Sequence, residues 1–336
     1  MIEIDGSYLE GGGQILRTSL GLSALTKKPI HIFNIRARRP TPGLKTQHLS
    51  VLLAIKDLCN AKLKGAKIGS KEIYFFPNKI DKDKLRIRIE TAGSVGLVLQ
   101  TIFLSSVNTD QNLRIRIEGG GTFGKWAPSI IYLQKVFLKT LEKFGFLAKI
   151  EVLKHGFYPK GGAKVVAEIY KSNLNGFVIR RVIKKIEGIS IASENLKNRK
   201  VAEREVEGVK KIIENLNMPA EIKTEYVSSL SVGTGVELWT TPTILGASSL
   251  GEFMKSSENV GREAGELLAR EINSGATVDK HLADQLIPFM ALADGHSSYK
   301  VSELTNHTKT NIWVTEKFID RKFKIKKIGE LFEVFV

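Results

Sequence analysis

The sequence predicts an α+β protein in which three repeated βαβαββ units form one large domain, with a small α+β domain inserted in the third unit. Alternating apolar runs, typical of strands, recur between segments whose apolar residues have helical spacing. The same order of strands and helices occurs twice in succession, over roughly 80 to 90 residues each, which indicates an internal repeat. It occurs a third time if one interruption is allowed.

The first unit opens with the alternating run Ile2-Glu3-Ile4. Its expected elements are strand 2–4, a helix after the glycines, strand 30–35, helix 44–59, and strands 61–63 and 72–76. Glycines 11–13 form the turn between the first strand and the first helix, where the helix N–H groups could approach a phosphate. Glycine required only for the backbone angles of the turn is an equal alternative. The pattern is neither a Rossmann fingerprint nor a Walker loop.

The second unit repeats this order. Its expected elements are strand 85–89, a glycine turn and helix from 93 to about 107, strand 113–117, helix 128–144, and strands 149–152 and 163–169. Each unit therefore begins with a strand that passes through a turn into a helix. Two units that agree in period, glycine turns and alternation indicate duplication.

The third unit is interrupted. Its expected elements are strand 176–183, helix 281–293, strand 299–303, helix 307–319, and strands 323–328 and 332–336. The interruption has its own pattern: strand 188–192, helix 200–216, several strands between 221 and 245, and helix 258–272. A separate α+β domain fits this pattern. The expected boundaries are 1–186 and 278–336 for the large domain, and 187–277 for the insert.

Composition limits the classes of function. The 336 residues carry a formal charge of +16, which favours nucleic acid as a partner over an acidic membrane surface. A solvated lysine-rich exterior is the alternative. Cys59 is the only cysteine, which excludes intrachain disulfides and cysteine zinc sites. With no apolar run of membrane-spanning length, we expect a cytoplasmic protein that does not bind membranes. The oligomeric state stays open.

Three glutamines occur near the starts of the three first helices, namely Gln14, Gln100 and Gln285. A surface position explains any one of them. Together they suggest that these helices point their N-termini toward related positions, although symmetry of the core could also place them there.

Two of the six histidines stand out by position. His48 lies in the second helix of the first unit, and His307 begins the corresponding helix of the third. Thr305 and Asn306 are good N-caps, so His307 would lie at the positive end of its helix, which favours the neutral, nucleophilic imidazole. Position alone does not choose between the two histidines.

The loop 35–45 contains four cations and two prolines before a helix. Arginine binds phosphate bidentately, so this loop could hold a phosphorylated end, or it could be an exposed basic loop without a ligand.

Trp126 and Tyr158, in or near other glycine-rich loops, could stack on bases or pack in the core. Asp284 could bind a metal or a ribose hydroxyl, or only favour the helix dipole.

Together these motifs resemble the RNA 3'-terminal phosphate cyclase family. The matching segments are Asp5-Gly6, Glu10-Gly11-Gly12-Gly13-Gln14-Ile15-Leu16-Arg17, Ile35-Arg36-Ala37-Arg38, Pro42-Gly43-Leu44, Gln47-His48-Leu49, Ala92-Gly93-Ser94, Leu97-Val98-Leu99-Gln100-Thr101, His155-Gly156-Phe157-Tyr158-Pro159, Leu282-Ala283-Asp284-Gln285-Leu286, and His307 with Thr310-Asn311-Ile312. Weaker matching is confined mainly to the insert. The resemblance implies the same three-unit domain with a small insert.

The resemblance also implies an enzyme of the ligase class that uses ATP and a divalent metal, Mg2+ or Mn2+, to convert an RNA 3'-phosphate into a 2',3'-cyclic phosphate. In such enzymes the histidine before the Thr-Asn-Ile element becomes adenylylated, which selects His307 over His48. An RNA-adenylate then forms, and the neighbouring 2'-OH closes the ring.

The resemblance assigns further roles. Glu10 would help to hold the metal, and Arg36, Arg38, Arg39 and His48 would face the RNA end. The nucleotide would be bound by Gln14, Arg17, Gln100, Pro128, His281, Leu282, Ala283, Asp284 and Gln285. Relatives often have tyrosine where this chain has His281.

Two other functions compete. One is a cyclase-like RNA-binding assembly factor without catalysis, against which His307, Glu10 and Gln14 argue. The other is a different ATP-dependent RNA-end enzyme that uses the same covalent adenylate, for example on 5'-phosphates.

Overall fold

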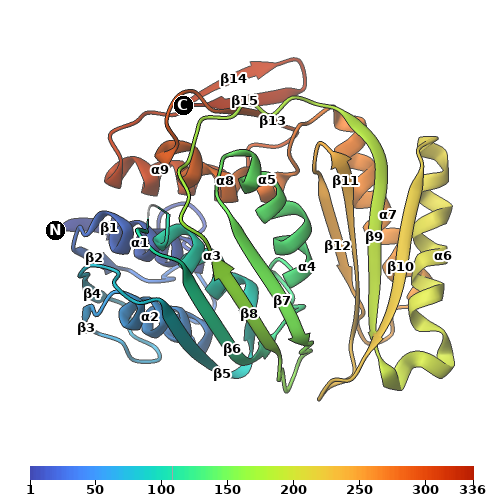
Figure 1. Ribbon diagram of the computed structural model, residues 1–336, viewed down its shortest axis with the longest axis horizontal. Coiled ribbons are helices and arrows are strands. Elements are labelled where there is room, and N and C mark those ends of the chain that lie inside the picture. Colours follow the sequence, from blue (N-terminus) through green and yellow to red (C-terminus); the bar gives the residue numbers. More distant parts are fainter. Residues whose placement is uncertain (108) are drawn as a thin grey trace.

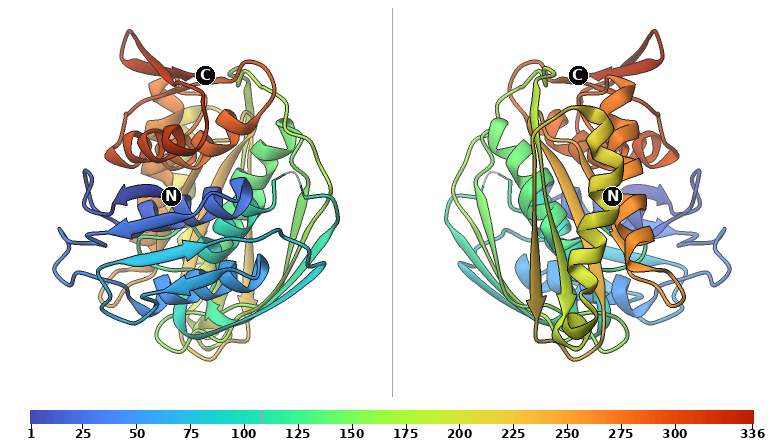
Figure 2. Two further views of the ribbon diagram at one scale, coloured as in Figure 1. Left: turned by 90° about the vertical axis from the view of Figure 1, so that its left-hand side faces the viewer. Right: turned by 90° about the vertical axis from the view of Figure 1, so that its right-hand side faces the viewer.

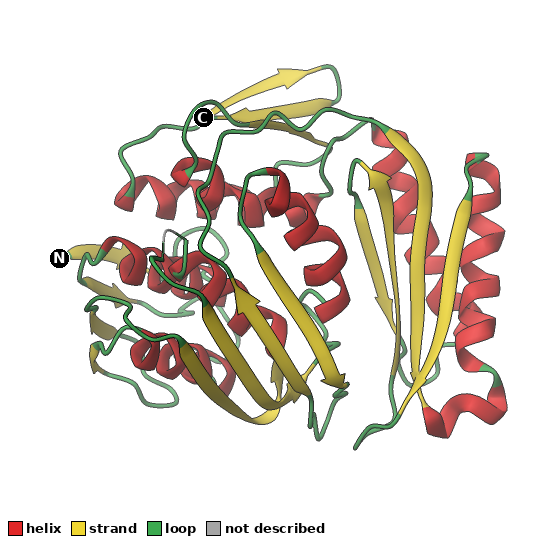
Figure 3. Cartoon of the chain, viewed as in Figure 1, coloured by secondary structure: helices red, strands yellow, loops and turns green. Residues whose placement is uncertain are grey.

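Four small sheets with packed helices make up the computed structural model, which describes residues 1–107 and 109–336. Figure 3 shows helices and strands mixed throughout the chain, so the predicted α+β class is confirmed. In Figure 1 the N-terminal sheet lies at the left, the β5–β8 sheet in the centre and the C-terminal sheet at the top. Seen from both sides, the C-terminal elements lie above the N-terminal ones (Figure 2).

The first sheet has the strand order β1-β2-β4-β3. β1 pairs with β2 in parallel, and the other pairs are antiparallel. Its elements are β1 (Ile2–Asp5), α1 (Gly13–Thr26), β2 (Ile30–Phe33), α2 (Thr46–Leu58), β3 (Lys62–Lys64) and β4 (Ile73–Phe76). All six expected elements are present, with ends shifted by a few residues.

The second sheet has the corresponding order β5-β6-β8-β7. Its elements are β5 (Lys84–Ser94), α3 (Val95–Ser105), β6 (Leu113–Gly121), α4 (Ile130–Tyr132), α5 (Leu138–Lys143), β7 (Ala148–Lys154) and β8 (Lys164–Ile169). A π-helical turn at Leu133–Phe137 joins α4 to α5 within the expected helix. That helix begins at Ile130 because Ser129 is its N-cap and accepts the N–H of Tyr132.

The third sheet has the order β13-β15-β14, and the expected strand 176–183 is wrong. Only one parallel bridge, Val178 to Ser298, joins that segment to β13. The chain then turns away, because Arg181 donates to the Ile272 carbonyl and Val182 donates to Thr243. The elements are α8 (Lys280–Leu292), β13 (Ser298–Val301), α9 (Asn306–Phe318), β14 (Lys324–Ile328) and β15 (Leu331–Phe335).

The fourth sheet, order β10-β9-β11-β12, lies beside the other three with α6 and α7 on its outer face (Figure 1). We call this sheet and its two helices the β9–β12 layer. Its elements are β9 (Ile183–Ser193), α6 (Val201–Ile213), β10 (Ala220–Val227), β11 (Thr234–Pro242), β12 (Gly246–Leu250) and α7 (Ser257–Ser274).

Helix packing in the middle of the molecule positions the site. α1 packs against α3 and α9, and α8 packs against α9. Two side-chain bonds tie these helices together: Thr18 donates to Asn311, and Asn311 donates to the Asp284 carbonyl. Within residues 1–107 and 109–336, no helix is both long and apolar enough to cross a membrane.

Candidate active site

His307 is the second residue of α9, directly after the N-cap Thr305 and Asn306. Thr305 accepts the N–H of Thr308 at 3.1 Å, which fixes the start of the helix. The imidazole is half-buried, and it lies between two side chains from the glycine turn, Glu10 and Gln14. The two ends of the chain therefore meet at this ring.

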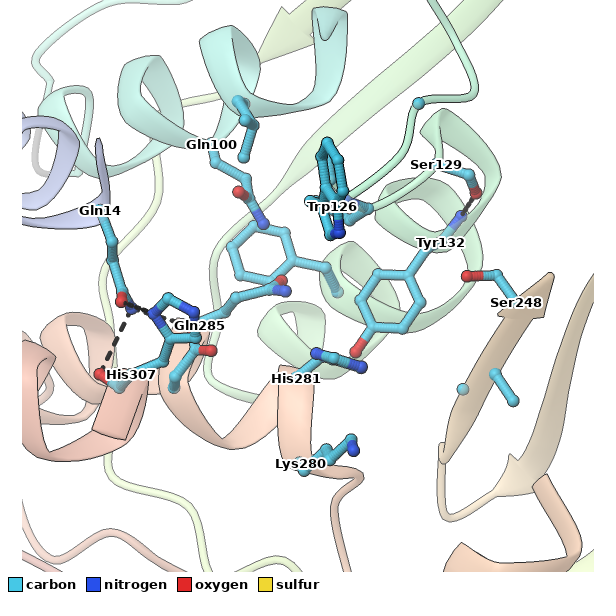
Figure 4. A pocket seen from close by; sticks show the side chains of 18 of the residues that line it. Gln14, Gln100, Trp126, Ser129, Tyr132, Ser248, Lys280, His281, Gln285 and His307 are labelled. Atoms are coloured by element: carbon cyan, nitrogen blue, oxygen red, sulfur yellow. Dashed lines mark hydrogen bonds between the residues drawn. The ribbon is translucent and has the colours of Figure 1, made fainter. Parts of the chain in front are cut away.

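Gln14 determines which nitrogen of His307 is free. Its Nε2 donates to Asp284 Oδ1 and to the His307 carbonyl, both at 3.3 Å, so its Oε1 is left to face His307 Nδ1 (Figure 4). Because an amide oxygen only accepts, Nδ1 must carry the proton. The lone pair of a neutral ring is then on Nε2, which lies 3.1 Å from Glu10 Oε2.

The pKa of His307 is lowered from its ordinary value, so the ring is neutral near pH 7. Burial is the largest cause, and the charges of Arg17 and Arg39 lower the pKa further, whereas Glu10 raises it. The sequence predicted a neutral ring from the helix end alone. Burial among cations is the larger cause in the structure.

Adenylylation is therefore expected to persist in mild acid. Attack requires neutral imidazole, and a lowered pKa keeps the ring neutral at pH values where an ordinary histidine is protonated. The rate at limiting ATP should stay near its plateau at pH 6.5 and fall only at lower pH. A pH–rate profile of adenylylation tests this, and a half-maximal rate at or above pH 6.5 would contradict it.

The N-terminus of α1 is open toward the site. Gly12 is the N-cap and offers no side chain, so the first N–H groups of the helix are available to an anion. Gly11 has φ +56°, which requires glycine, whereas Gly13 is needed for space: a Cβ there would lie 2.3 Å from His48 Nε2. The glycines thus serve both the turn and a close approach.

His48 is buried beside this helix end. Its Nδ1 accepts the Lys45 N–H at 3.1 Å, and burial together with the charges of Arg17, Arg36 and Lys45 lowers its pKa to about 3. It is therefore a neutral group that closes the start of α2. Arg17 lines the cavity, and burial lowers its pKa to about 10, so it stays charged at pH 7.

The arginines of the basic loop are not equivalent. Arg36 donates to the carbonyls of Thr41 and Gly43 at 2.6 and 3.0 Å, which closes its own loop. Arg38 donates to the Leu9 carbonyl. Only Arg39 reaches the site directly, where its Nη2 lies 3.3 Å from Glu10 Oε2.

A cavity of about 530 Å³ extends from His307 toward the β9–β12 layer. The three glutamines singled out by the sequence, Gln14, Gln100 and Gln285, all line it (Figure 4). Gln100 Nε2 and Gln285 Oε1 are buried without a hydrogen-bond partner among the described residues. A buried donor and a buried acceptor without partners are suited to a polar ligand.

Only some residues of the 281–285 segment face this cavity. His281, Asp284 and Gln285 line it together with Pro128, whereas Leu282 and Ala283 are fully buried in the core. Positions three and four apart lie on one side of a helix, so residues 284 and 285 face the same way as His281. The two residues between them face the core. The assignment of Leu282 and Ala283 to nucleotide binding therefore stays a prediction, and their side chains do not line the cavity.

Several cavity residues were missed from the sequence. They are Ser129, Tyr132, residues 246–250, Glu252, Lys255, Glu263, Leu267, Glu271 and Lys280. Lys280 could have been found beside His281, but β12 and α7 show no ligand-binding motif. Trp126 forms part of the rim and is 91% exposed, so it is not a core residue.

Glu10 is the carboxylate best placed for a metal ion. The described part of the chain has no group of three or more His, Cys, Asp or Glu side chains suited to a metal. Mg2+ commonly uses one or two protein carboxylates and shares the rest of its shell with water and substrate phosphates. Glu10, half-buried beside an open helix N-terminus, fits such a shared site.

Comparison with known proteins identifies the family of the chain. A family model described as RNA 3'-terminal phosphate cyclase matches residues 8–325. Two similar proteins are named RNA 3'-terminal phosphate cyclase. The one from Methanosarcina barkeri is 46% identical to this chain over 336 residues, which cover 100% of both chains. The one from Pyrococcus abyssi is 45% identical over 330 residues, which cover 97% of this chain and 95% of that protein. The chain therefore belongs to the RNA 3'-terminal phosphate cyclase family.

Proposed function

We propose that this protein is an RNA 3'-terminal phosphate cyclase, which uses ATP to convert an RNA 3'-phosphate into a 2',3'-cyclic phosphate. The observation that best supports the proposal is the orientation of His307. Gln14 occupies Nδ1, and the neutral ring offers Nε2 at the end of a cavity large enough for a nucleotide. Family membership supplies the reaction class.

In the first step His307 Nε2 attacks the α-phosphorus of ATP. A nitrogen–phosphorus bond forms, and the bond to the β-phosphate oxygen breaks, releasing pyrophosphate. Gln14 stabilises the ring by accepting a hydrogen bond from Nδ1–H, which gains positive character as Nε2 bonds to phosphorus. Arg17 would bind the phosphates from α1, and Pro128, His281 and Gln285 would surround the adenosine.

In the second step an oxygen of the RNA 3'-phosphate attacks the AMP phosphorus and breaks its bond to His307. The adjacent 2'-OH then attacks the 3'-phosphorus, loses its proton, and expels AMP as the ring closes. The tethered hydroxyl makes this last step favourable once AMP is the leaving group.

We assign the RNA end to the opening beside α1. Arg39 and the free N–H groups of that helix offer positive charge next to His307, and His48 lies beside them. Arg36 and Arg38 would act by shaping the loop that holds Arg39, because their guanidinium groups are bonded to main-chain carbonyls. Glu10 would hold Mg2+ or Mn2+, which when bound neutralises phosphate charge.

We also propose that the large domain consists of three repeated units, 1–186 and 278–336 together, interrupted by 187–277. The matching strand orders β1-β2-β4-β3 and β5-β6-β8-β7 support this. In the third sheet, the bridge from Val178 to Ser298 adds the segment before β9 at the equivalent edge of β13-β15-β14.

Two measurements test the function. With ATP labelled at the α-phosphate, an acid-labile protein label should appear when Mg2+ or Mn2+ is present. With a 3'-phosphorylated oligonucleotide, the product should become resistant to phosphatase as a cyclic phosphate. A lack of label would favour the non-catalytic assembly factor, and an adenylated 5'-end without cyclisation would favour the other RNA-end enzyme.

Gln285→Leu is expected to weaken selection of the base. Its Oε1 is a buried acceptor without a partner in the described structure, and the exocyclic amine of adenine is a donor that could satisfy it. Loss of one such bond should lower the preference for ATP over GTP about tenfold. The measurement is the ratio of half-saturating concentrations for the two nucleotides in the labelling assay. An unchanged ratio would place the base elsewhere.

A further inference from the structure

One wall of the nucleotide cavity comes from the β9–β12 layer. This wall consists of residues 246–250 of β12, Glu252 and Lys255 of the following loop, and Glu263, Leu267 and Glu271 of α7. Pro128 and Tyr132 of the large domain also line the cavity, and Tyr132 packs against Gly246 of β12. The layer is therefore part of the site and not an appendage beside it.

The side chains of β11 alternate between two faces of the layer. Val236 and Leu238 join the core formed with α6 and α7. Glu237 and Trp239 point the other way, where Trp239 enters the main core of the molecule. This period of two buries both faces of the strand and brings one carboxyl group, that of Glu237, to the boundary with the large domain.

Glu237 bonds to the residue next to Pro128. Its Oε2 accepts the hydroxyl of Ser129, whose Oγ in turn accepts the Tyr132 N–H at 2.9 Å. Ser129 is the N-cap of α4, so the direction of its hydroxyl sets how the helix begins. Through Ser129, Glu237 holds both Pro128 and Tyr132 at the cavity wall.

A second bond fixes the same wall from β12. The N–H of Gly246 donates to Asp279 Oδ2 at 2.9 Å, and Tyr132 Oη donates to Asp279 Oδ1 at 2.8 Å. Asp279 is also the N-cap of α8, where it accepts the N–H of His281 at 3.0 Å. One buried polar network thus joins β11, β12, the start of α4 and the start of α8.

We propose that Glu237 is a positioning residue for ATP: it lets the β9–β12 layer set the shape of the adenosine end of the cavity through Ser129, Pro128 and Tyr132. This inference rests on the proposed function, since it requires that the cavity takes ATP. The β9–β12 layer would then affect how tightly ATP binds, whereas His307, at the other end of the cavity, would carry out the transfer of AMP.

The burial of Glu237 supports a specific role. Its side chain is 0% exposed, and its Oε1 has no partner among the described residues. A buried carboxyl with one unpaired oxygen destabilises a fold, so packing alone would favour an apolar residue. Burial also raises the pKa of Glu237 well above its ordinary value.

The test compares Glu237→Leu with Glu237→Gln. Affinity for ATP is measured by equilibrium binding, and the maximal rate by transfer of the α-phosphate label. Leucine cannot accept the Ser129 hydrogen bond, so we expect roughly tenfold weaker ATP binding with a maximal rate within about threefold of wild type. Glutamine restores an acceptor and should bind ATP within about threefold of wild type.

Glu205 supplies the matched control. It is also 0% exposed in the same layer, but it lies on α6 and accepts from Ser190 and Thr234, away from the cavity. Glu205→Leu should leave ATP affinity unchanged in protein that remains folded. If leucine at 237 unfolds the protein, Ser129→Ala removes the same bond from the other side and should weaken ATP binding similarly.

Three results would overturn the proposal: unchanged ATP affinity in Glu237→Leu or Ser129→Ala, an equal loss in Glu205→Leu, or a fall in maximal rate without a change in affinity. Wild-type protein that does not bind ATP would also overturn it. Wild-type protein that binds ATP but transfers no label would contradict the proposed cyclase function alone, since the affinity comparison would still decide the role of Glu237.

Discussion

His307→Ala is expected to lower protein adenylylation by at least about a thousandfold, because it removes the only atom proposed to bond to AMP. The fold should tolerate the change, since the ring is 43% exposed and lies at a helix end already capped by Thr305. The measurement is the rate of label transfer from α-labelled ATP, with thermal unfolding to show that the variant is folded.

Two histidine variants serve as comparisons. His31→Ala removes a ring on β2 that bonds to Glu3 and Glu72, and it should label like wild type. His48→Ala addresses the rival nucleophile. The assignment fails if His307→Ala still labels while His48→Ala does not. Retained labelling in both would place the adenylate on another residue.

Glu10→Gln is expected to slow adenylylation by roughly a hundredfold and to raise the Mg2+ concentration needed for half-maximal rate, because the amide is a much weaker metal ligand. Protonation of His307 cannot explain such a loss. Glu10 raises the pKa of that ring, so removing its charge lowers the pKa further and makes the ring more completely neutral. Metal titrations of the labelling rate measure the effect.

Glu3→Gln is the matched control for Glu10. Glu3 lies on β1, the strand that precedes the turn containing Glu10, and its carboxylate bonds to His31 away from the cavity. Its substitution should change neither the rate nor the metal dependence. If Glu10→Gln slows transfer but shows the wild-type metal dependence, the carboxylate acts on His307 and not on the metal.

The sequence predicted most elements because their patterns are local. Helix 307–319 was placed within a residue of α9 by its N-cap and its apolar spacing. The prediction of strand 176–183 was wrong because the conformation of this segment depends on distant partners. Arg181 bonds to the end of α7, and Val182 bonds to Thr243. No property of that segment alone shows these contacts.

The site was predictable where a residue's type states its chemistry. His307, Glu10 and Gln14 meet in the structure, as the family resemblance implied. The wall contributed by β12 was not predictable, because Gly246 acts there through its backbone N–H. The sequence also did not show which arginine of the basic loop is available to a ligand. That depends on hydrogen bonds to main-chain carbonyls, such as the bond from Arg38 to the Leu9 carbonyl.

Gln14 and His307 are 293 positions apart, yet two hydrogen bonds join them. Domains generally fold as units during synthesis, beginning with the N-terminal part, so the first two sheets can form while α9 is still on the ribosome. A nascent chain would therefore have its glycine turn and basic loop before it has His307, the proposed nucleophile. On the proposed assignments, such a chain could already bind an RNA end. It could not form the adenylate from ATP until α9 has emerged and docked against α1.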